Sequence, residues 1–441
     1  MLIKDIYKAA SGEKDSVRPI LSSRWFIPTV VVAGFAVRLC WILTFHPTPV
    51  SDFNFYFQSA ASIASGHGYV TEGGFATAYF PIGYSLFLAT LFWVFGASVI
   101  VAQMANLILS MMSLVLVYWI ARDLFCSEIV GRLSLLFSAV YLNNVAYTAL
   151  VGVETLYLFL LLLGVALLMT SPSRKRFARH GRLVISGLVF GFATLVKVQT
   201  LLLPVLILLL PPRLEMRLRF NVDRVKKVAI LYVSLIAVLT PWVVRNYGLY
   251  HNIVLSNNSG INLYIGNGPE ATGRWVGIPW FGIRNDTLDE YKVDQVAGKK
   301  AVNFMRTHPW QTLKLAPKKL FALYFHGDGV LWNIIGIPRE SEMSRSLLRV
   351  LDKVNAVYEF LIFMLFVPSL IYGCWRRLRI GKGYGWPLLG SVIIFYFTGI
   401  YLVYYGMARH NFPIVLWMMM YSAALLSSLF AEVAKRNSLN E

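Results

Sequence analysis

Charged residues are scarce in this sequence: they make up 14% of its 441 residues, while 57% are hydrophobic. A composition of this kind excludes a soluble globular protein and is typical of a chain that crosses a membrane several times. Cysteine is scarce too, and Cys40, Cys126 and Cys374 lie far apart in or beside apolar segments. The sequence therefore predicts no disulfide framework, and it predicts a polytopic membrane protein.

Acidic residues are fewer than basic ones, 22 against 41, which gives a net charge of +19. A basic excess can indicate nucleic-acid binding, but here the basic residues form short clusters between apolar runs, at 174–182, 213–227 and 376–382. Clusters of this kind encode membrane orientation, because Lys and Arg stay on the cytoplasmic side. The sequence thus predicts a lipid bilayer and no nucleic acid as partner, with both termini in the cytoplasm.

Apolar segments of suitable length occur about ten times, within a range of roughly 9 to 13, if a helix needs about 20 residues to cross the hydrocarbon layer. The predicted spans lie near 25–45, 99–121, 129–149, 155–170, 184–198, 199–211, 228–245, 352–373, 386–405 and 411–431. The expected fold is an all-α polytopic bundle with interfacial helices in the first outer loop and a small mixed extracytoplasmic region.

Domain boundaries follow from the spans and their orientation. The apolar run 81–95 must not cross completely, since a crossing would place Arg122 and Arg132 outside. We therefore expect helices in the outer interface between Asn54 and Phe95, broken at glycines and at Pro81. The predicted parts are a cytoplasmic segment 1–24, an N-terminal transmembrane module 25–245 with the first outer loop 46–98, an extracytoplasmic loop region 246–347 with interfacial helices, C-terminal transmembrane helices 348–431 and a cytoplasmic tail 432–441.

No Lys or Arg occurs between Arg38 and Arg122, and in that stretch Asp52 and Glu72 carry the only formal charges. Asp52 stands just past the first predicted span and begins the sequence Asp-Phe-Asn-Phe-Tyr-Phe. The predicted topology places Glu154 on the same outer face. Two carboxylates on one face of the membrane make Asp52 the first candidate for a catalytic base, with Glu154 beside it.

Cations also stand at the outer ends of three predicted spans, as Lys197, Arg245 and Arg409, the last followed by His410. Ionisable residues at membrane depth are expensive and tend to be functional. Any one of them alone is explained equally well by a side chain that snorkels to the interface or forms a local ion pair. Together they place carboxylates that can abstract a proton beside cations that can bind an anion. A reaction on a lipid-linked phosphate requires both.

These residues stand in motifs that resemble those of the GT-C glycosyltransferases, most closely the branch of the protein O-mannosyltransferases and the lipid A aminoarabinose transferase. The first outer loop carries the resemblance with Asp52, Tyr56, Gly66-His67-Gly68-Tyr69 and Tyr79-Phe80-Pro81-Ile82-Gly83-Tyr84. Further matches are Val153-Glu154-Thr155, Thr194-Leu195-Val196-Lys197, Pro241-Trp242-Val243-Val244-Arg245-Asn246-Tyr247, Asn262-Leu263-Tyr264-Ile265-Gly266-Asn267 and Arg409 to Pro413.

The resemblance implies a donor sugar on a polyprenyl phosphate and an acceptor hydroxyl on a glycan, a lipid or a protein. It implies an inverting reaction at the outer face of a membrane, which we expect to be a bacterial inner membrane with the site facing the periplasm or exterior. Asp52 matches the catalytic aspartate of the family. Lys197, Arg245 and Arg409, with His410, match positions for the donor phosphate, and the expected substrate pocket contains Tyr56, His67, Tyr79, Tyr84 and Asn267.

A metal cofactor stays open at this point. Glu154 matches a second acidic position that in relatives lies near the site and can join a metal. Asp52 and Glu154 alone offer too few ligands to specify a metal site, and the sequence supplies no cluster of His and Cys. The sequence therefore assigns no cofactor with certainty. A divalent metal at Asp52 and Glu154 is the alternative that stays open.

A transporter or flippase of a lipid-linked or amphipathic substrate is the main alternative from another class. Such folds carry repeats, broken helices and charges near the middle of the bilayer. This sequence shows no internal repeat, and its notable charges gather at one interface. The pattern favours the glycosyltransferase.

Overall fold

The computed structural model describes residues 19–169, 176–209, 222–277, 290–325, 329–337, 342–380 and 388–440. Within these ranges the regular structure is helical, and the single β feature is an isolated antiparallel bridge between Val70 and Ala76. Residues 1–18 of the predicted N-terminal segment and several basic residues of the predicted clusters, at 174–175, 213–219 and 382, lie outside the described residues.

Five stretches among the described residues are long and apolar enough to cross a membrane. They are α3 (Phe26–Thr44), α6 (Val99–Phe125), α12 (Val222–Tyr250), most of α18 (Glu342–Ile380), and η3 (Ala408–Asn411) together with the first part of α20 (Phe412–Asn440). Shorter apolar helices stand at the other predicted spans: α9 (Val153–Met169), α10 (Arg176–Val196), α11 (Leu203–Leu209) and α19 (Leu389–Val403). The prediction of an all-α polytopic membrane protein is confirmed.

One predicted span, near 129–149, is a bent pair. Helix α7 (Glu128–Val140) is followed by α8 (Leu142–Ala146) and η1 (Tyr147–Ala149), with a bend of 56° between them. Arg38 of α3 is fully buried and donates to the last carbonyls of α7, those of Ser138 and Ala139. A buried guanidinium thus satisfies carbonyl groups that the bend leaves without helical partners.

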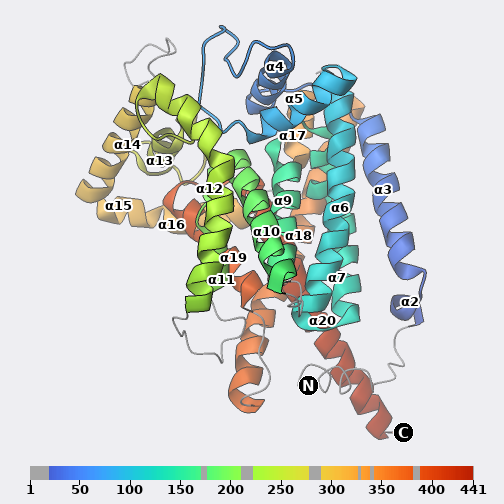
Figure 1. Ribbon diagram of the computed structural model, residues 1–441. Coiled ribbons are helices and arrows are strands. Elements are labelled where there is room, and N and C mark those ends of the chain that lie inside the picture. The colour runs from blue at the N-terminus through green and yellow to red at the C-terminus, as the bar shows by residue number, and fades with distance from the viewer. Residues whose placement is uncertain are drawn as a thin grey trace.

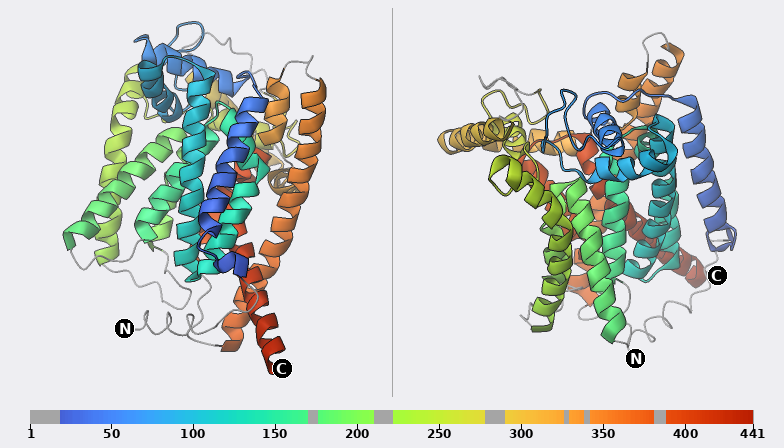
Figure 2. Two further views of the ribbon diagram at one scale, coloured as in Figure 1. Left: turned by 90° about the vertical axis from the view of Figure 1, so that its right-hand side faces the viewer. Right: turned by 45° about the horizontal axis from the view of Figure 1, so that its top comes forward.

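The centre of the bundle is α20, which packs against α7, α18 and α19. In its apolar window 67% of the residues are buried, against 28% in α3, and α3 lies at the edge of the bundle in Figures 1 and 2. The far end of α20 points away from the end of the bundle where α4 and α5 lie (Figure 1). The apolar surface of α3, which is mostly not buried within the protein, is suited to contact lipid.

The first outer loop forms two short helices, α4 (Asp52–Ala64) and α5 (Gly83–Phe95), which lie over one end of the bundle (Figure 1). Helix α5 has 13 residues, so it is about 20 Å long and too short for a hydrocarbon layer of about 30 Å. Two short helices in this loop are thus confirmed, while their position in the membrane interface stays a prediction. The boundaries of the predicted domains stay predictions.

The described part of the predicted extracytoplasmic region is helical. Helices α13 (Ser259–Asn267), α14 (Glu290–Thr307), α15 (Pro309–Lys314) and α16 (Ala316–Tyr324) lie on one side of the bundle (Figure 1). Helix α17 (Gly329–Gly336) instead packs against α8 and α18. The carbonyl of Gly336 accepts hydrogen bonds from Thr48, and Asn333 bonds to Trp41 and Ala146, so α17 is fixed to the end of α3 and to the bend after α7.

Candidate active site

Four charged side chains from distant parts of the chain meet at the end of the bundle where α4 and α5 lie. Arg409 donates from Nη2 to Asp52 Oδ2 over 2.6 Å, and its Nε lies 3.9 Å from Glu154 Oε1. Lys197 Nζ lies 3.4 Å from the same Glu154 oxygen. We call Asp52, Glu154, Lys197 and Arg409 the charged quartet. The structure therefore brings together four of the residues that the sequence singled out.

Helix termini position three members of the quartet, and Arg409 lies in η3 directly before α20. Asp52 is the first residue of α4 and Glu154 is the second residue of α9, where the positive end of the helix dipole favours a carboxylate. Lys197 directly follows α10, and its backbone N–H bonds to Ala193 at the negative end of that helix. The residue before Asp52, Ser51, has a φ of 54°, which is a strained backbone conformation for a residue with a side chain.

Two glycines permit the close approach of these helix ends. A Cβ at Gly152 would stand 2.6 Å from Glu154 Oε2 and 2.9 Å from a ring atom of Phe53. A Cβ at Gly83 would stand 2.6 Å from the backbone of Leu195, two residues before Lys197. A larger residue at Gly83 would push the backbone before Lys197 away from α5, and one at Gly152 would displace the side chains of Glu154 and Phe53.

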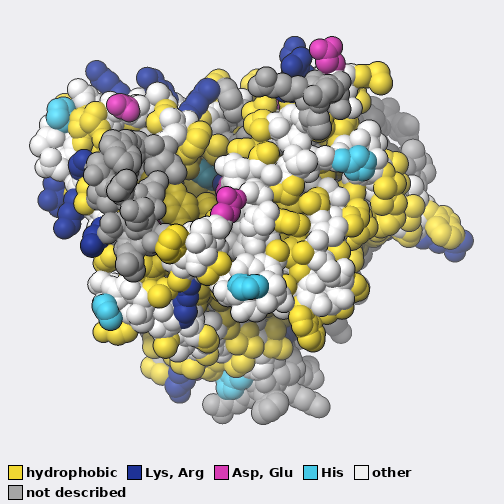
Figure 3. Space-filling model, turned by 90° about the horizontal axis from the view of Figure 1, so that it is seen from above, with side chains coloured by type: hydrophobic (Ala, Val, Ile, Leu, Met, Phe, Trp, Pro, Cys, Tyr) yellow, Lys and Arg dark blue, Asp and Glu magenta, His cyan; other side chains and the backbone are white. Residues whose placement is uncertain are grey.

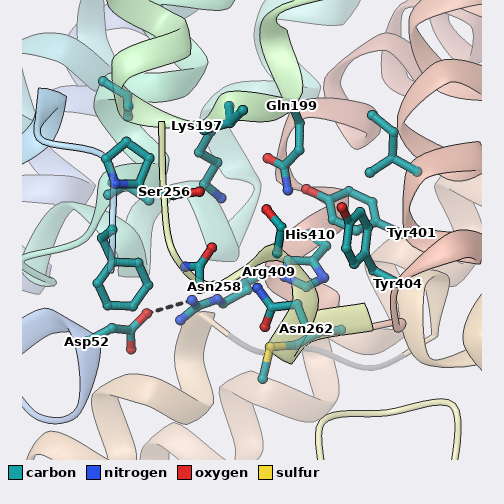
Figure 4. Close-up of a pocket in the computed structure, with 18 of the residues that line it drawn as sticks. Asp52, Lys197, Gln199, Ser256, Asn258, Asn262, Tyr401, Tyr404, Arg409 and His410 are labelled. Carbon is teal, nitrogen blue, oxygen red and sulfur yellow. Dashed lines mark hydrogen bonds and ion pairs between the residues drawn. The ribbon is translucent and has the colours of Figure 1, made fainter. Parts of the chain in front are cut away.

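A cavity of about 700 Å³ opens beside the quartet. Figure 4 shows Asp52 at one end of it, Gln199, Tyr401 and Tyr404 at the other, and Arg409 and His410 between them. Leu201, Leu202 and Ile400 give one part of the wall an apolar character.

The surface around the site is unevenly charged. Seen from above, Lys and Arg side chains gather on the side of α14–α16, away from the surface over α5 and α6 (Figure 3).

Six of the predicted site residues line this cavity: Asp52, Tyr56, Tyr79, Lys197, Arg409 and His410. Glu154 is 1% exposed and lies behind the wall, where it contacts Lys197 and Arg409. Burial, with the charge of Asp52 as a further cause, raises the pKa of the Tyr56 phenol well above its ordinary value. Tyr56 is therefore a neutral hydroxyl beside Asp52 at any ordinary pH.

Arg245, predicted to bind the donor phosphate, does not line the cavity. Its guanidinium donates to the backbone carbonyls of Thr77 (2.6 Å) and Tyr69 (3.0 Å) in the first outer loop. The same loop is held by Glu290 of α14, which accepts from Thr77 Oγ1 at 2.7 Å and from the N–H of Ala78 at 2.7 Å. We call Arg245 and Glu290 the loop anchor.

Three other predicted pocket residues also lie outside the cavity wall. His67 is exposed and its Nδ1 lies 2.9 Å from Ser65 Oγ within the loop. Tyr84 is fully buried, with its ring against that of Tyr56. Asn267 bonds to the carbonyl of Val403 and accepts from Lys319 Nζ over 2.7 Å. Their surroundings fit packing and positioning better than contact with a substrate.

The sequence reasoning missed polar residues that the folded chain adds to the cavity. Gln199, Trp332 and Tyr401 line it, and each has a buried polar side-chain atom without a hydrogen-bond partner among the described residues. His410 Nδ1 is in the same situation. The position of Gln199, two residues after Lys197, is a signal that could have found it. Trp332 stands in α17, whose apolar sequence gives no such signal.

The residues present do not fit a resident divalent metal. Magnesium and manganese can be held by one or two carboxylates with water and substrate phosphate, but here both carboxylates of the quartet face cations instead. No group of three or more His, Cys, Asp and Glu side chains suited to a metal occurs among the described residues. A metal at Asp52 and Glu154 would have to displace Arg409 or Lys197.

The comparisons with known proteins give one family match over part of the chain and several similar solved structures. Residues 80–244 match the sequence pattern of the dolichyl-phosphate-mannose-protein mannosyltransferases. No curated protein matches the sequence of this chain. The segment matched includes Glu154 and Lys197 but neither Asp52 nor Arg409, which stand on either side of it.

The oligosaccharyltransferase of Archaeoglobus fulgidus has a similar structure, solved with zinc and sulfate, with a TM-score of 0.53 and 12% identity over 92% of this chain. The same enzyme with a tethered acceptor peptide gives a TM-score of 0.54, also at 12% identity, over 95% of this chain. This chain spans about half the length of that enzyme, 50% and 51% in the two structures. The similarity to the oligosaccharyltransferase shows a shared fold. ArnT from Cupriavidus metallidurans bound to undecaprenyl phosphate gives a TM-score of 0.41 at 14% identity, over 92% of this chain and 78% of ArnT.

Proposed function

We propose that this chain, which is of the GT-C type by its fold and resembles mannosyltransferases over residues 80–244, transfers a sugar from a polyprenyl-phosphate donor to an acceptor hydroxyl at the extracytoplasmic face of the membrane. The observation that carries the proposal is the cavity in which Asp52 stands beside Arg409 and Lys197. A base and two cations in one partly apolar cavity suit a reaction that takes a proton and releases an amphipathic phosphate.

Asp52 is the proposed base. The hydroxyl of an acceptor has a pKa far above that of a carboxylate, so Asp52 takes the proton while the new bond forms, not beforehand. The acceptor oxygen bonds to the anomeric carbon as the bond from that carbon to the phosphate oxygen breaks. The electron pair leaves with the polyprenyl phosphate, and displacement from the opposite side inverts the configuration.

Arg409 and Lys197 are the proposed phosphate ligands, since both line the cavity. Charge grows on the bridging oxygen as the leaving group departs, and preformed donors there stabilise the transition state. A guanidinium can offer two parallel hydrogen bonds to a phosphate, whereas an ammonium acts as a point charge. His410, beside them in the wall, is a further donor or acceptor for the same group (Figure 4).

The donor's lipid fits the apolar part of the cavity. Leu201 and Leu202 follow η2 (Val198–Thr200), and Ile400 faces the same cavity from α19. A polyprenyl chain that lies against these residues would remain at membrane depth while its phosphate reaches Lys197. The acceptor would then approach from the side of Tyr79, Asn258 and Asn262.

The test is the release of polyprenyl phosphate from a panel of polyprenyl-phosphate sugars, by purified protein in membranes that contain candidate glycan, lipid and protein acceptors. We expect turnover by the wild type and a fall of about 10²- to 10⁴-fold in Asp52→Asn, since this is the usual contribution of a general base. Glu72→Gln is the matched control, because Glu72 is an exposed acid of the same loop outside the cavity wall.

Two outcomes would contradict the proposal. One is equal turnover by Asp52→Asn and wild type with both proteins folded. The other is an intact donor under all conditions while the protein moves the glycolipid across the membrane, which would favour the transporter.

A further inference from the structure

We propose that Arg409 holds the place between Asp52 and Glu154 that a divalent cation would otherwise take, so that sugar transfer by this chain requires no metal ion. Exclusion of a metal depends on the quartet alone, whereas transfer without a metal also rests on the proposed function.

The position of the guanidinium is the first observation. Its Nη2 is 2.6 Å from Asp52 and its Nε is 3.9 Å from Glu154, so one planar cation faces both carboxylates. Lys197 approaches Glu154 from another side at 3.4 Å. The two negative charges are thus matched by two positive charges before any substrate is present.

The guanidinium is held in place by its surroundings. Arg409 lies in η3, where His410 N–H bonds to Met407 and Asn411 bonds to the carbonyl of Leu323 over 2.9 Å. Its guanidinium carbon lies 5.9 Å from the centre of the Trp332 ring, and that ring makes an edge contact with Phe53, with ring centres 5.2 Å apart. The aromatic ring favours a cation at this position.

The charge balance decides which ligand the quartet can accept. A divalent metal would add two positive charges next to Arg409 and Lys197, and like charges in a partly buried site repel strongly. A phosphate adds negative charge, which both cations can take up without leaving their helix ends. The quartet therefore favours the anionic substrate over a metal, although two carboxylates without these cations would be a usable site for Mn²⁺.

Binding of Mn²⁺ to metal-free protein, followed by the loss of the electron paramagnetic resonance signal of free Mn²⁺, tests this directly. We expect the wild type to leave the signal unchanged and Arg409→Ala to bind one Mn²⁺ per chain. Binding should disappear again in the variant Arg409→Ala/Asp52→Asn/Glu154→Gln. Arg409→Lys, which keeps the charge, should exclude Mn²⁺ as the wild type does, and Arg245→Ala, which removes a cation outside the cavity, should not create a site.

Stoichiometric Mn²⁺ binding by the wild type that is lost in Asp52→Asn would overturn the proposal, as would a folded Arg409→Ala protein that binds none. Size-exclusion chromatography of each variant shows whether it folds. If Arg409→Ala fails to fold, Mn²⁺ binding by the wild type and by Arg409→Lys still tests the proposal, because both keep the cation and should bind no Mn²⁺. In the activity assay, transfer should be unchanged by EDTA. Transfer that EDTA abolishes and Mn²⁺ restores would overturn the metal-free proposal and leave the proposed function standing. If no donor is ever cleaved, the function fails, and the Mn²⁺ measurement still decides the role of Arg409.

Discussion

The charged quartet and the loop anchor contain the same kinds of residue but use them differently. In the quartet, charges contact charges at the wall of a cavity: Arg409 meets Asp52, and Lys197 meets Glu154. In the loop anchor, Arg245 donates to backbone carbonyls, and Glu290 accepts from a backbone N–H and neutral side chains. A side chain bonded to backbone holds the chain in place, whereas an ion pair at a cavity wall can exchange one partner for a ligand. Proximity of a cation to the membrane surface therefore does not decide whether it binds substrate.

The largest effect should come from breaking the quartet with Arg409→Met, which leaves Asp52 and Glu154 facing Lys197 alone. Removing one partner of a fully buried ion pair costs about 3–5 kcal/mol; this pair is partly buried, so we expect a smaller loss of stability, and transfer should be lost. The double variant Arg409→Met/Asp52→Asn should recover part of the stability and none of the activity. Thermal unfolding and donor turnover measured on the same preparations check both. Equal stability of the single and double variants would contradict the ion pair as the source of the loss.

A smaller effect should follow in the loop anchor. Arg245→Ala removes the guanidinium donor from the carbonyls of Tyr69 and Thr77. The Tyr69 carbonyl keeps a longer bond of 3.4 Å from the N–H of Thr77, so we expect a cost of about 1–3 kcal/mol, mainly from the Thr77 carbonyl. We expect faster hydrogen exchange in residues 65–82 and a higher KM for substrates, with kcat reduced less than in Asp52→Asn. Arg245→Lys should restore little, because one ammonium does not reproduce the fork that reaches both carbonyls. A variant with normal exchange in the loop and a lost affinity for polyprenyl phosphate would instead make Arg245 a phosphate ligand.

The smallest effect concerns Lys319, a third way to use a cation. It is almost fully buried, and its Nζ donates to Asn267 and to the Leu402 carbonyl near the end of α19. Burial lowers the pKa of Lys319 from 10.5 to about 8. At a pH between these two pKa values, Lys319 binds more protons in the unfolded chain than in the folded one. The contribution of this site to the free energy of unfolding therefore rises with pH. The difference in Tm between wild type and Lys319→Met should therefore shift in favour of wild type from pH 8 to pH 10, and a constant difference would contradict the assignment.

The sequence alone predicted the features that depend on local pattern. Hydropathy and length predicted the all-α membrane bundle. The positive-inside rule, with breaks at glycines and at Pro81, predicted short helices in the first loop, which are α4 and α5. The resemblance to GT-C glycosyltransferases is confirmed by the fold and by the match over residues 80–244. Asp52, Lys197 and Arg409 do meet in one cavity, while their catalytic roles stay proposals.

The remaining features depend on contacts between distant segments. Arg245 and Lys197 look alike in sequence, each at the outer end of an apolar segment, and only the loop that folds over Arg245 distinguishes them. Trp332 enters the site because α17 folds back against α8 and α18, which its apolar sequence does not indicate. Asn267 was expected in the pocket, but the buried ammonium of Lys319 takes its side-chain oxygen. Such partners are set by the tertiary fold and not by the neighbouring residues.

The most direct test of the central claim is the anomeric configuration of the product that the wild type forms from a donor of known configuration, determined by NMR. If Asp52 is a base that activates the acceptor in a single displacement, the configuration is inverted. Glu154 lies behind the cavity wall and cannot reach the anomeric carbon without a rearrangement of the quartet. Retention of configuration would mean two displacements through a bond to the protein and would contradict the role of Asp52 as the base.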